Sequence, residues 1–228
     1  MEYSIRLLNS AAHTEIVDGV DRSIVYLYGT TKEGESIAVR TPLLMPYFQV
    51  VEPTKDIIKK LKKDENVESI QAEDLWIDGE VKKCTRIITK QPGKIYKIKD
   101  WLKNNGFKPL SADIPFHYRY LYDNNLGGCV TVEGKEVKDR NFTCKLIDAT
   151  SVKPCEGFEA DFRILSFDIE NSIFERTIYC LSFCIKDSNG YIHEETLHGK
   201  ERDILKDFVS AVSKFDPDII TGYNIDGY

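Results

Sequence analysis

The chain has 228 residues, of which 42% are hydrophobic, 30% charged and 11% aromatic, with a net charge of −6. This composition is typical of a globular protein of one large or two modest domains, and it excludes a disordered or collagen-like chain. No stretch approaches the roughly 20 apolar residues of a membrane-spanning helix, and the first residues lack the apolar run of a signal peptide, so we expect a cytoplasmic protein.

The negative net charge does not by itself exclude nucleic acid, because charges are screened beyond about 10 Å and their local distribution matters more than their sum. Lysines do cluster, over residues 59–63, 82–83 and 94–103. Such clusters are equally typical of solvated helix faces, so charge alone indicates no partner. The six cysteines form no C-x-x-C pair, which favours reduced thiols in a core over a zinc site.

Residues 3–41 predict two or three strands, over residues 3–8, 22–29 and 35–40. Residues 42–116 predict the order strand, helix, strand, strand, helix, strand. Thr54 is a helix cap, Asp78-Gly79 is a hairpin turn signal, and Pro92-Gly93 opens the second helix, which ends at Gly106. The last strand of this unit is expected over residues 107–116. The order βαββαβ is the ferredoxin-like pattern.

Residues 122–160 mix glycine, lysine and short β-prone runs, which indicates a connector with a small strand pair. From residue 161 onwards three strands, a helix over residues 200–214 and a further buried strand match the start of an RNase H-like domain. The apolar side of this helix is expected to hold Ile204, Leu205, Phe208, Val209 and Val212. The predicted fold class is therefore α+β and α/β, with an amino-terminal domain at 1–130, a connector at 131–160 and an incomplete RNase H-like domain at 161–228.

The sequence SFDIE holds two carboxylates, Asp168 and Glu170, on one expected strand, which the apolar residues around them predict to be mostly buried. Positions i and i+2 of a strand point to the same side, so the two side chains lie together. Paired carboxylates bind hard divalent cations, and two such ions assist phosphodiester hydrolysis. A lone D-x-E is equally found as a surface pair at a strand end.

The sequence SFDIE, followed some fifty residues later by DPDIITGYN, resembles the first two exonuclease motifs of family B DNA polymerases, in particular the archaeal type. The resemblance implies that Asp168 and Glu170 are catalytic ligands of two Mg²⁺ or Mn²⁺ ions, and that Tyr223 and Asn224 contact the single-stranded primer end. The second motif of the family also matches Tyr228 and places its metal-binding aspartate at the next position. The chain as printed ends before it, so we expect an incomplete metal site.

The resemblance further implies a DNA-directed DNA polymerase with 3′→5′ exonuclease activity, of which this is an amino-terminal fragment. Its partners would be template and primer DNA, the remainder of the polymerase and a sliding clamp, and the protein itself would be cytoplasmic and associated with the nucleoid. Two other functions stay open from the sequence. One is a stand-alone, non-catalytic module that binds single-stranded nucleic acid, and the other is a free RNase H-like exonuclease.

A second segment, DIPFHYRYLYD at residues 113–123, resembles the uracil-reading segment of archaeal family B polymerases, which captures uracil in the template strand. The resemblance implies a pocket that is built from three separate segments of the chain. Its residues would be Pro46, Tyr47, Pro92, Ile95, Ile114, Pro115 and Phe116, with Arg119 in contact with DNA. Stiff apolar walls of this kind suit a flipped base. The same residues are equally suited to an ordinary core.

Overall fold

The computed structural model describes residues 1–172, 174–223 and 225 of the chain. The chain forms two compact units, the first of residues 1–29 and 37–156 and the second of residues 30–36 and 157–228. Each unit is built around cores of its own, so each is described by itself.

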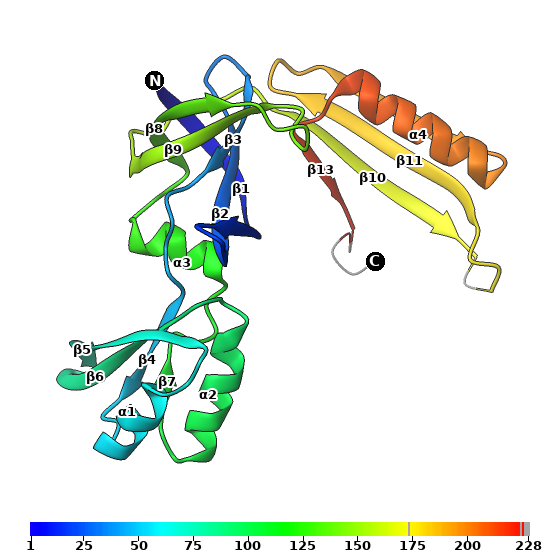
Figure 1. The fold of residues 1–228 in the computed structure, drawn as a ribbon. Coiled ribbons are helices and arrows are strands. Elements are labelled where there is room, and N and C mark those ends of the chain that lie inside the picture. Colours follow the sequence, from blue (N-terminus) through cyan, green and yellow to red (C-terminus); the bar gives the residue numbers. More distant parts are fainter. Residues whose placement is uncertain (173, 224, 226–228) are drawn as a thin grey trace. The chain divides into compact units, whose positions relative to one another are not determined.

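Five strands of the first unit form a closed barrel in the order β1, β2, β3, β9, β8 (Figure 1). They are β1 (Glu2–Val17), β2 (Val20–Thr30), β3 (Ser36–Arg40), β8 (Cys129–Val137) and β9 (Lys145–Pro154). Strand β3 is parallel to β9, whereas β8 is antiparallel to both β1 and β9. The interior is filled by alternate residues, among them Ile5, Leu27 and Val130, which are fully buried.

The barrel differs from the sequence prediction at two places. Strand β1 continues to Val17, well beyond the expected end at Leu8. Strands β8 and β9 lie largely in the stretch that the sequence suggested as a connector with a small strand pair, and they are full barrel strands. Pairing between residues as distant as Tyr3 and Val132 stabilises these strands, and local patterns carry no signal for such pairing.

A ferredoxin-like body is inserted between β3 and the later barrel strands, and the predicted βαββαβ order is confirmed. Its elements are β4 (Tyr47–Val51), α1 (Lys55–Leu61), β5 (Val67–Ile77), β6 (Glu80–Thr89), α2 (Lys94–Asn104) and β7 (Pro109–Leu110). The sheet order is β5, β6, β4, β7. Both helices pack on one face of this sheet, over Phe48, Val50 and Ile87.

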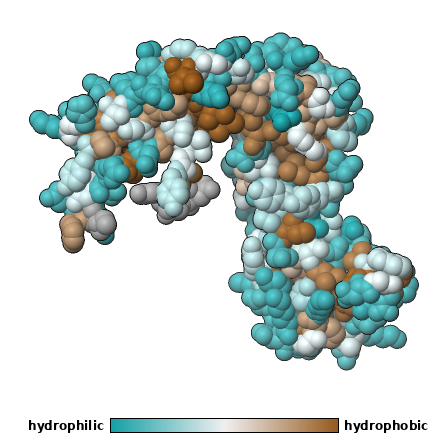
Figure 2. Space-filling view, turned by 180° about the vertical axis from the view of Figure 1, so that it is seen from behind, coloured by the Kyte–Doolittle hydropathy of each residue, from teal (hydrophilic) through white to brown (hydrophobic). Residues whose placement is uncertain are grey.

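Local signals explain the boundaries of the ferredoxin-like body. The Thr54 hydroxyl accepts a hydrogen bond of 3.4 Å from the Ile57 N–H and so caps α1. Asp78 and Gly79 both have positive φ, at 53° and 85°, which is the geometry of a two-residue hairpin turn. Figure 2 shows hydrophilic residues spread over the outer surface of this body, with apolar residues between them.

The strand predicted over residues 107–116 is wrong for most of its length. Only Pro109 and Leu110 pair as β7, and helix α3 (Phe116–Asp123) begins at the last residue of the predicted strand. Phe116 and Tyr120, one turn apart, pack against the barrel interior. This burial at helical spacing outweighs the β-propensity of the aromatic residues.

The second unit contains β10 (Arg163–Asn171), β11 (Ile178–Asp187), β12 (Ile192–His198), α4 (Glu201–Phe215) and β13 (Ile219–Gly222). The sheet order is β12, β11, β10, β13, and only β13 is parallel to its neighbour β10. The RNase H-like order of elements predicted from the sequence is confirmed.

Helix α4 covers one face of this sheet and leaves the described residues of the other face open. Its Ile204 is buried and its Phe208 packs against Phe167 and Phe183. Two side chains predicted on the buried side of the helix, Leu205 and Val209, are instead exposed. The expected burial of the last strand is also wrong, because Ile220 is 46% exposed.

All six cysteines are free thiols, as the sequence indicates, and two of them, Cys84 and Cys129, are buried. Among residues 1–172, 174–223 and 225, no helix combines the length and the apolar character that crossing a membrane requires.

Candidate nucleic-acid interface

A small hollow of about 70 Å³ lies in the first unit and is lined by three segments that are distant in sequence. Its walls are formed by the start of β4, the start of α2 and the segment that leads into α3 and its first turn. The lining residues are Tyr47, Pro92, Gly93, Ile95, Tyr96, Ala112, Ile114, Pro115, Phe116 and Arg119. Seven residues that the sequence assigned to the pocket or to DNA contact therefore meet at one place.

The small volume of this hollow limits the size of the group that it can hold. Typical small-molecule sites enclose about 300–1,000 Å³, so a hollow of about 70 Å³ suits one flat ring rather than a whole nucleotide. Its walls are mostly apolar, and Pro92 and Pro115 make them stiff because proline fixes φ. Pro115 stands directly before α3, and its carbonyl accepts a hydrogen bond of 3.0 Å from the Arg119 N–H.

Pro46 is the one predicted pocket residue that does not line the hollow. It is buried, and its carbonyl instead accepts a 2.8 Å hydrogen bond from the Thr89 N–H and extends the pairing of β4 with β6. Conversely, the sequence reasoning did not name Tyr96 or Ala112 as lining residues. The helical spacing of Pro92, Ile95 and Tyr96 was the available signal for Tyr96.

Tyr47 is the centre of the polar contacts beside the hollow. Its hydroxyl donates a 2.8 Å hydrogen bond to Asp123 at the end of α3. The guanidinium groups of Arg86 and Arg119 lie over its ring, with their central carbons 4.3 Å and 4.4 Å from the ring centroid. Burial and the bond to Asp123 raise the pKa of Tyr47 and Arg119 opposes this, so Tyr47 stays a neutral donor at physiological pH.

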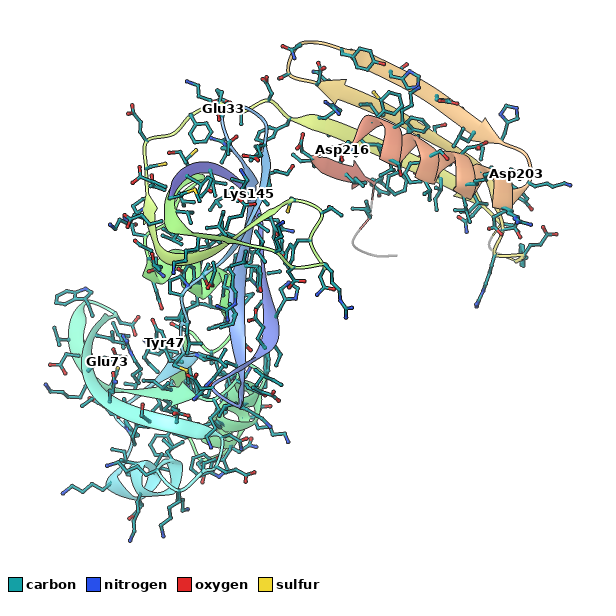
Figure 3. All side chains as sticks on the ribbon, turned by 45° about the horizontal axis from the view of Figure 1, so that its top comes forward. Glu33, Tyr47, Glu73, Lys145, Asp203 and Asp216 are labelled. Carbon is teal, nitrogen blue, oxygen red and sulfur yellow. The ribbon has the colours of Figure 1, made fainter. Side chains whose placement is uncertain are left out.

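Arg86 links Tyr47 to a second strand of the same sheet. It lies on β6, between β4 and β5, and forms a 2.8 Å ion pair with Glu73 of β5. Figure 3 labels Tyr47 and Glu73 on this sheet. The ion pair with Glu73 holds Arg86 over the Tyr47 ring, on the face of the sheet opposite the helices. The sequence gave no indication of this role of Arg86.

Arg119 is 6% exposed, and one of its terminal nitrogens donates a 2.6 Å hydrogen bond to the Ser111 carbonyl. Ser111 has a positive φ of 55°, so the Arg119 bond also holds an unusual turn before α3. The structure therefore gives Arg119 a role inside the wall of the hollow. The predicted contact of Arg119 with a DNA phosphate stays a prediction.

Asp168 and Glu170 lie on the open face of the second unit. Along β10, Leu165, Phe167 and Ile169 pack beneath α4, so the alternate residues point to the opposite side. Both carboxylates are exposed, in contrast to the mostly buried strand that the sequence predicted. Residues that pair with them on β11 are Ser182 opposite Asp168 and Cys180 opposite Glu170.

A shallow cleft of about 420 Å³ on this face is shared by Asp168 and Tyr223. Hydroxyl and carboxylate side chains from β11 and β12, including Ser182, Thr196 and Glu194, complete its lining. Tyr223 is 90% exposed, so its ring is accessible to a ligand. Asn224 and Tyr228, which the sequence also assigned to the second motif, lie outside the described residues.

Carboxylate oxygens at i and i+2 are suitable donors for Mg²⁺ or Mn²⁺. Within residues 1–172, 174–223 and 225, however, no group of three or more histidine, cysteine or acidic side chains is placed to hold a metal ion. The described part of the chain thus offers two carboxylates, Asp168 and Glu170, and they fit a site that needs further ligands.

We expect Mn²⁺ at a concentration on the order of 1 mM to broaden the amide NMR signals of residues 167–171, because two carboxylates bind a hard cation weakly. The double variant Asp168→Asn/Glu170→Gln should remove this broadening. The matched control, Asp203→Asn/Asp207→Asn, changes two exposed acids one turn apart on α4 and should leave it intact. Equal broadening in all three chains would show that these carboxylates bind no metal.

The chain matches known proteins along nearly all of its length. Residues 182–228 match the model of the DNA polymerase family B exonuclease domain. A DNA polymerase of Archaeoglobus fulgidus is 30% identical over 198 residues, which cover 80% of this chain and 24% of that protein. The DNA polymerase delta catalytic subunit of Dictyostelium discoideum is 24% identical over 88% of this chain and 25% of its own length.

The fold is also similar to that of a polymerase of known structure. The family B DNA polymerase from the hyperthermophilic archaeon Pyrobaculum calidifontis matches with a TM-score of 0.79 and 23% identity, over 99% of this chain and 31% of that one. The fold and the matched model define the class as a chain that contains the start of an RNase H-like exonuclease domain. In sequence and in fold the chain is similar to family B DNA polymerases, and it spans about a quarter of the length of the relatives it matches.

Proposed function

We propose that the chain reads single-stranded template DNA through its first unit and contributes the first carboxylates of a 3′→5′ proofreading exonuclease through its second. As the activity of the whole protein we propose DNA-directed DNA synthesis with proofreading. Its partners would be template and primer DNA, the rest of the polymerase and a sliding clamp. The observation that carries the proposal is the convergence of three separate segments on one base-sized hollow in a chain similar to family B DNA polymerases.

The hollow suits a flipped uracil for steric reasons. Uracil lacks the methyl group of thymine, so a stiff wall rejects thymine while it accepts uracil. Ile114, Pro115 and Phe116 supply such a wall, and the stacked guanidinium of Arg119 keeps the adjacent Tyr47 ring in place. The sugar and phosphates of the captured nucleotide remain outside, since the hollow has room for a ring alone.

In the second unit, Asp168 and Glu170 would hold divalent metal ions, together with ligands that the described residues do not supply. Such ions, when bound, activate water and stabilise the leaving oxygen of the cleaved phosphodiester. Tyr223 stands in the cleft beside Asp168, where its exposed ring would stack on a base of the primer end. Asn224 is proposed as a second DNA contact.

The test is a titration of the 228-residue chain with two short single-stranded oligonucleotides that differ only in one uracil or thymine. Fluorescence anisotropy at fixed salt measures both affinities, because phosphate contacts make affinity strongly salt-dependent. We expect tighter binding of the uracil oligonucleotide, by about tenfold, which is the usual effect of one methyl group in a tight pocket. A stand-alone binding module without base reading would bind the two oligonucleotides equally.

A further inference from the structure

The outer face of the barrel carries a second aromatic cluster that the proposed function does not use. Along β2, Val25 and Leu27 point into the barrel, so Tyr26 and Tyr28 point outward. The Tyr26 ring is nearly parallel to that of Tyr28, with centroids 6.4 Å apart and an angle of 20°. Phe142, from the loop between β8 and β9, stacks on Tyr26 at 5.6 Å and 14°.

A hollow of about 830 Å³ lies beside these rings. Polar side chains also line it, among them His13, Arg40 and Lys138. Its volume falls within the range of about 300–1,000 Å³ that is typical of ligand sites. The hollow shares no lining residue with the hollow at Tyr47, so the two are separate sites.

The position of this hollow in the barrel indicates the kind of ligand. The barrel order β1, β2, β3, β9, β8, with α3 between the third and fourth barrel strands, is that of a five-stranded OB-fold. In OB-folds the face of the second and third strands and the loop between the fourth and fifth strands bind oligonucleotides. Tyr26 and Tyr28 lie on the second strand, Arg40 on the third, and Phe142 in the loop between the fourth and fifth.

Side chains of both charges line this hollow, and most of the positive charge lies on the loop that carries Phe142. Arg40 forms ion pairs with Glu15 at 2.8 Å and with Asp148 at 3.0 Å, and Tyr26 donates a 2.7 Å hydrogen bond to Glu15. The single positive charge of Arg40 is shared between these two acids, and Asp139 is a third acid that lines the hollow. The loop that carries Phe142 also presents the exposed cations Lys138 and Arg140, which are placed to meet phosphates.

We propose that this face is a second site for single-stranded DNA, at which bases stack on the rings of Phe142 and Tyr28 without regard to their identity. Stacking on aromatic side chains is tolerant of sequence because every base has a π face. This second site would extend the proposed template reading, because stacking holds a strand whether or not it contains uracil. It rests on the proposed function only in taking DNA as the ligand.

The test uses a short oligonucleotide of thymine alone, titrated by anisotropy into the full 228-residue chain. Stacking of one base contributes about 1–3 kcal/mol, so Phe142→Ala should weaken binding about fivefold or more. Tyr28→Leu keeps an apolar side chain but removes the ring, and it should weaken binding similarly. The matched control is Trp76→Ala, which removes a 74% exposed ring on β5 and should leave the affinity unchanged.

The outcomes separate this site from the uracil hollow. Unchanged thymine binding in both Phe142→Ala and Tyr28→Leu would overturn the stacking site, and so would absence of thymine binding by the unaltered chain. Loss of thymine binding in those variants with no uracil preference in the unaltered chain would retain this site and reject the uracil hollow. Circular dichroism of each variant shows that the barrel is still folded when binding is lost.

Discussion

Replacement of Gly134 by alanine is expected to lower the free energy of unfolding of the first unit by about 3 kcal/mol, the upper part of the range for overpacked interiors. Gly134 is buried in β8, at a shift in the register of the pairing with β9. An alanine Cβ there would clash with the Asp148 carbonyl oxygen and would lie 2.9 Å from the Ala149 Cα. Both are backbone atoms of the neighbouring strand, so no side-chain rotation relieves the contact.

The position of Gly134 is further constrained by the amino terminus. Its N–H donates to the Met1 carbonyl at 3.1 Å, and the Met1 ammonium donates to its carbonyl at 3.0 Å. Urea denaturation followed by circular dichroism measures the effect. Gly127→Ala is the matched control, because no atom lies within 4 Å of a Cβ at that position. Equal stability of the two variants would show that β8 and β9 do not approach as closely as described.

The second large effect is expected for Ile114→Ala. Ile114 lines the small hollow and is half-buried, so its truncation widens the wall and makes room for the methyl group of thymine. The uracil preference of about tenfold should fall to near one, mainly through tighter binding of thymine. Phe116 is less suited to this test because it also packs in the barrel core, where truncation costs about 3–5 kcal/mol of stability.

Ile70→Ala is the matched control for Ile114→Ala. Ile70 is also half-buried and belongs to the same ferredoxin-like body, but it does not line the hollow. The same chemical change should therefore leave the uracil preference intact. A preference that survives Ile114→Ala, or that Ile70→Ala removes equally, would mean that the wall at Ile114 does not read the base.

Much of the fold follows from short-range patterns in the sequence. The cap at Thr54 and the turn at Asp78-Gly79 each depend on neighbouring residues alone, and the structure has both. Barrel closure depends instead on pairs such as Ile5 with Val130, which no local pattern specifies. For this reason β8 and β9 were predicted only as a small strand pair within a connector.

The sequence at the start of α3 contains a helix signal that the predicted strand did not take into account. Phe116, Arg119 and Tyr120 are spaced as i, i+3 and i+4, the spacing of a helix, and all three are buried on that helix. The aromatic composition of the segment favoured a strand, and packing on the barrel decided for the helix. The contact between Tyr26 and Phe142 likewise depends on the fold, because the two residues are distant in sequence.

The residues of the candidate sites were predicted more completely than their surroundings. The motif resemblance places Ile114, Pro115 and Phe116 at the hollow, and the structure brings them together with Tyr47. The resemblance gave no indication of Arg86, whose contact with Tyr47 depends on the pairing of β4 with β6. The paired acids were predicted as residues of a mostly buried strand, whereas the described residues leave Asp168 and Glu170 exposed.

The most direct test of the template-reading account is the comparison of uracil and thymine at a single position of an otherwise identical single strand, with the unaltered 228-residue chain at one salt concentration. We predict about tenfold tighter binding of the uracil strand. Equal affinity for the two strands would contradict base reading by the hollow at Tyr47 and Ile114.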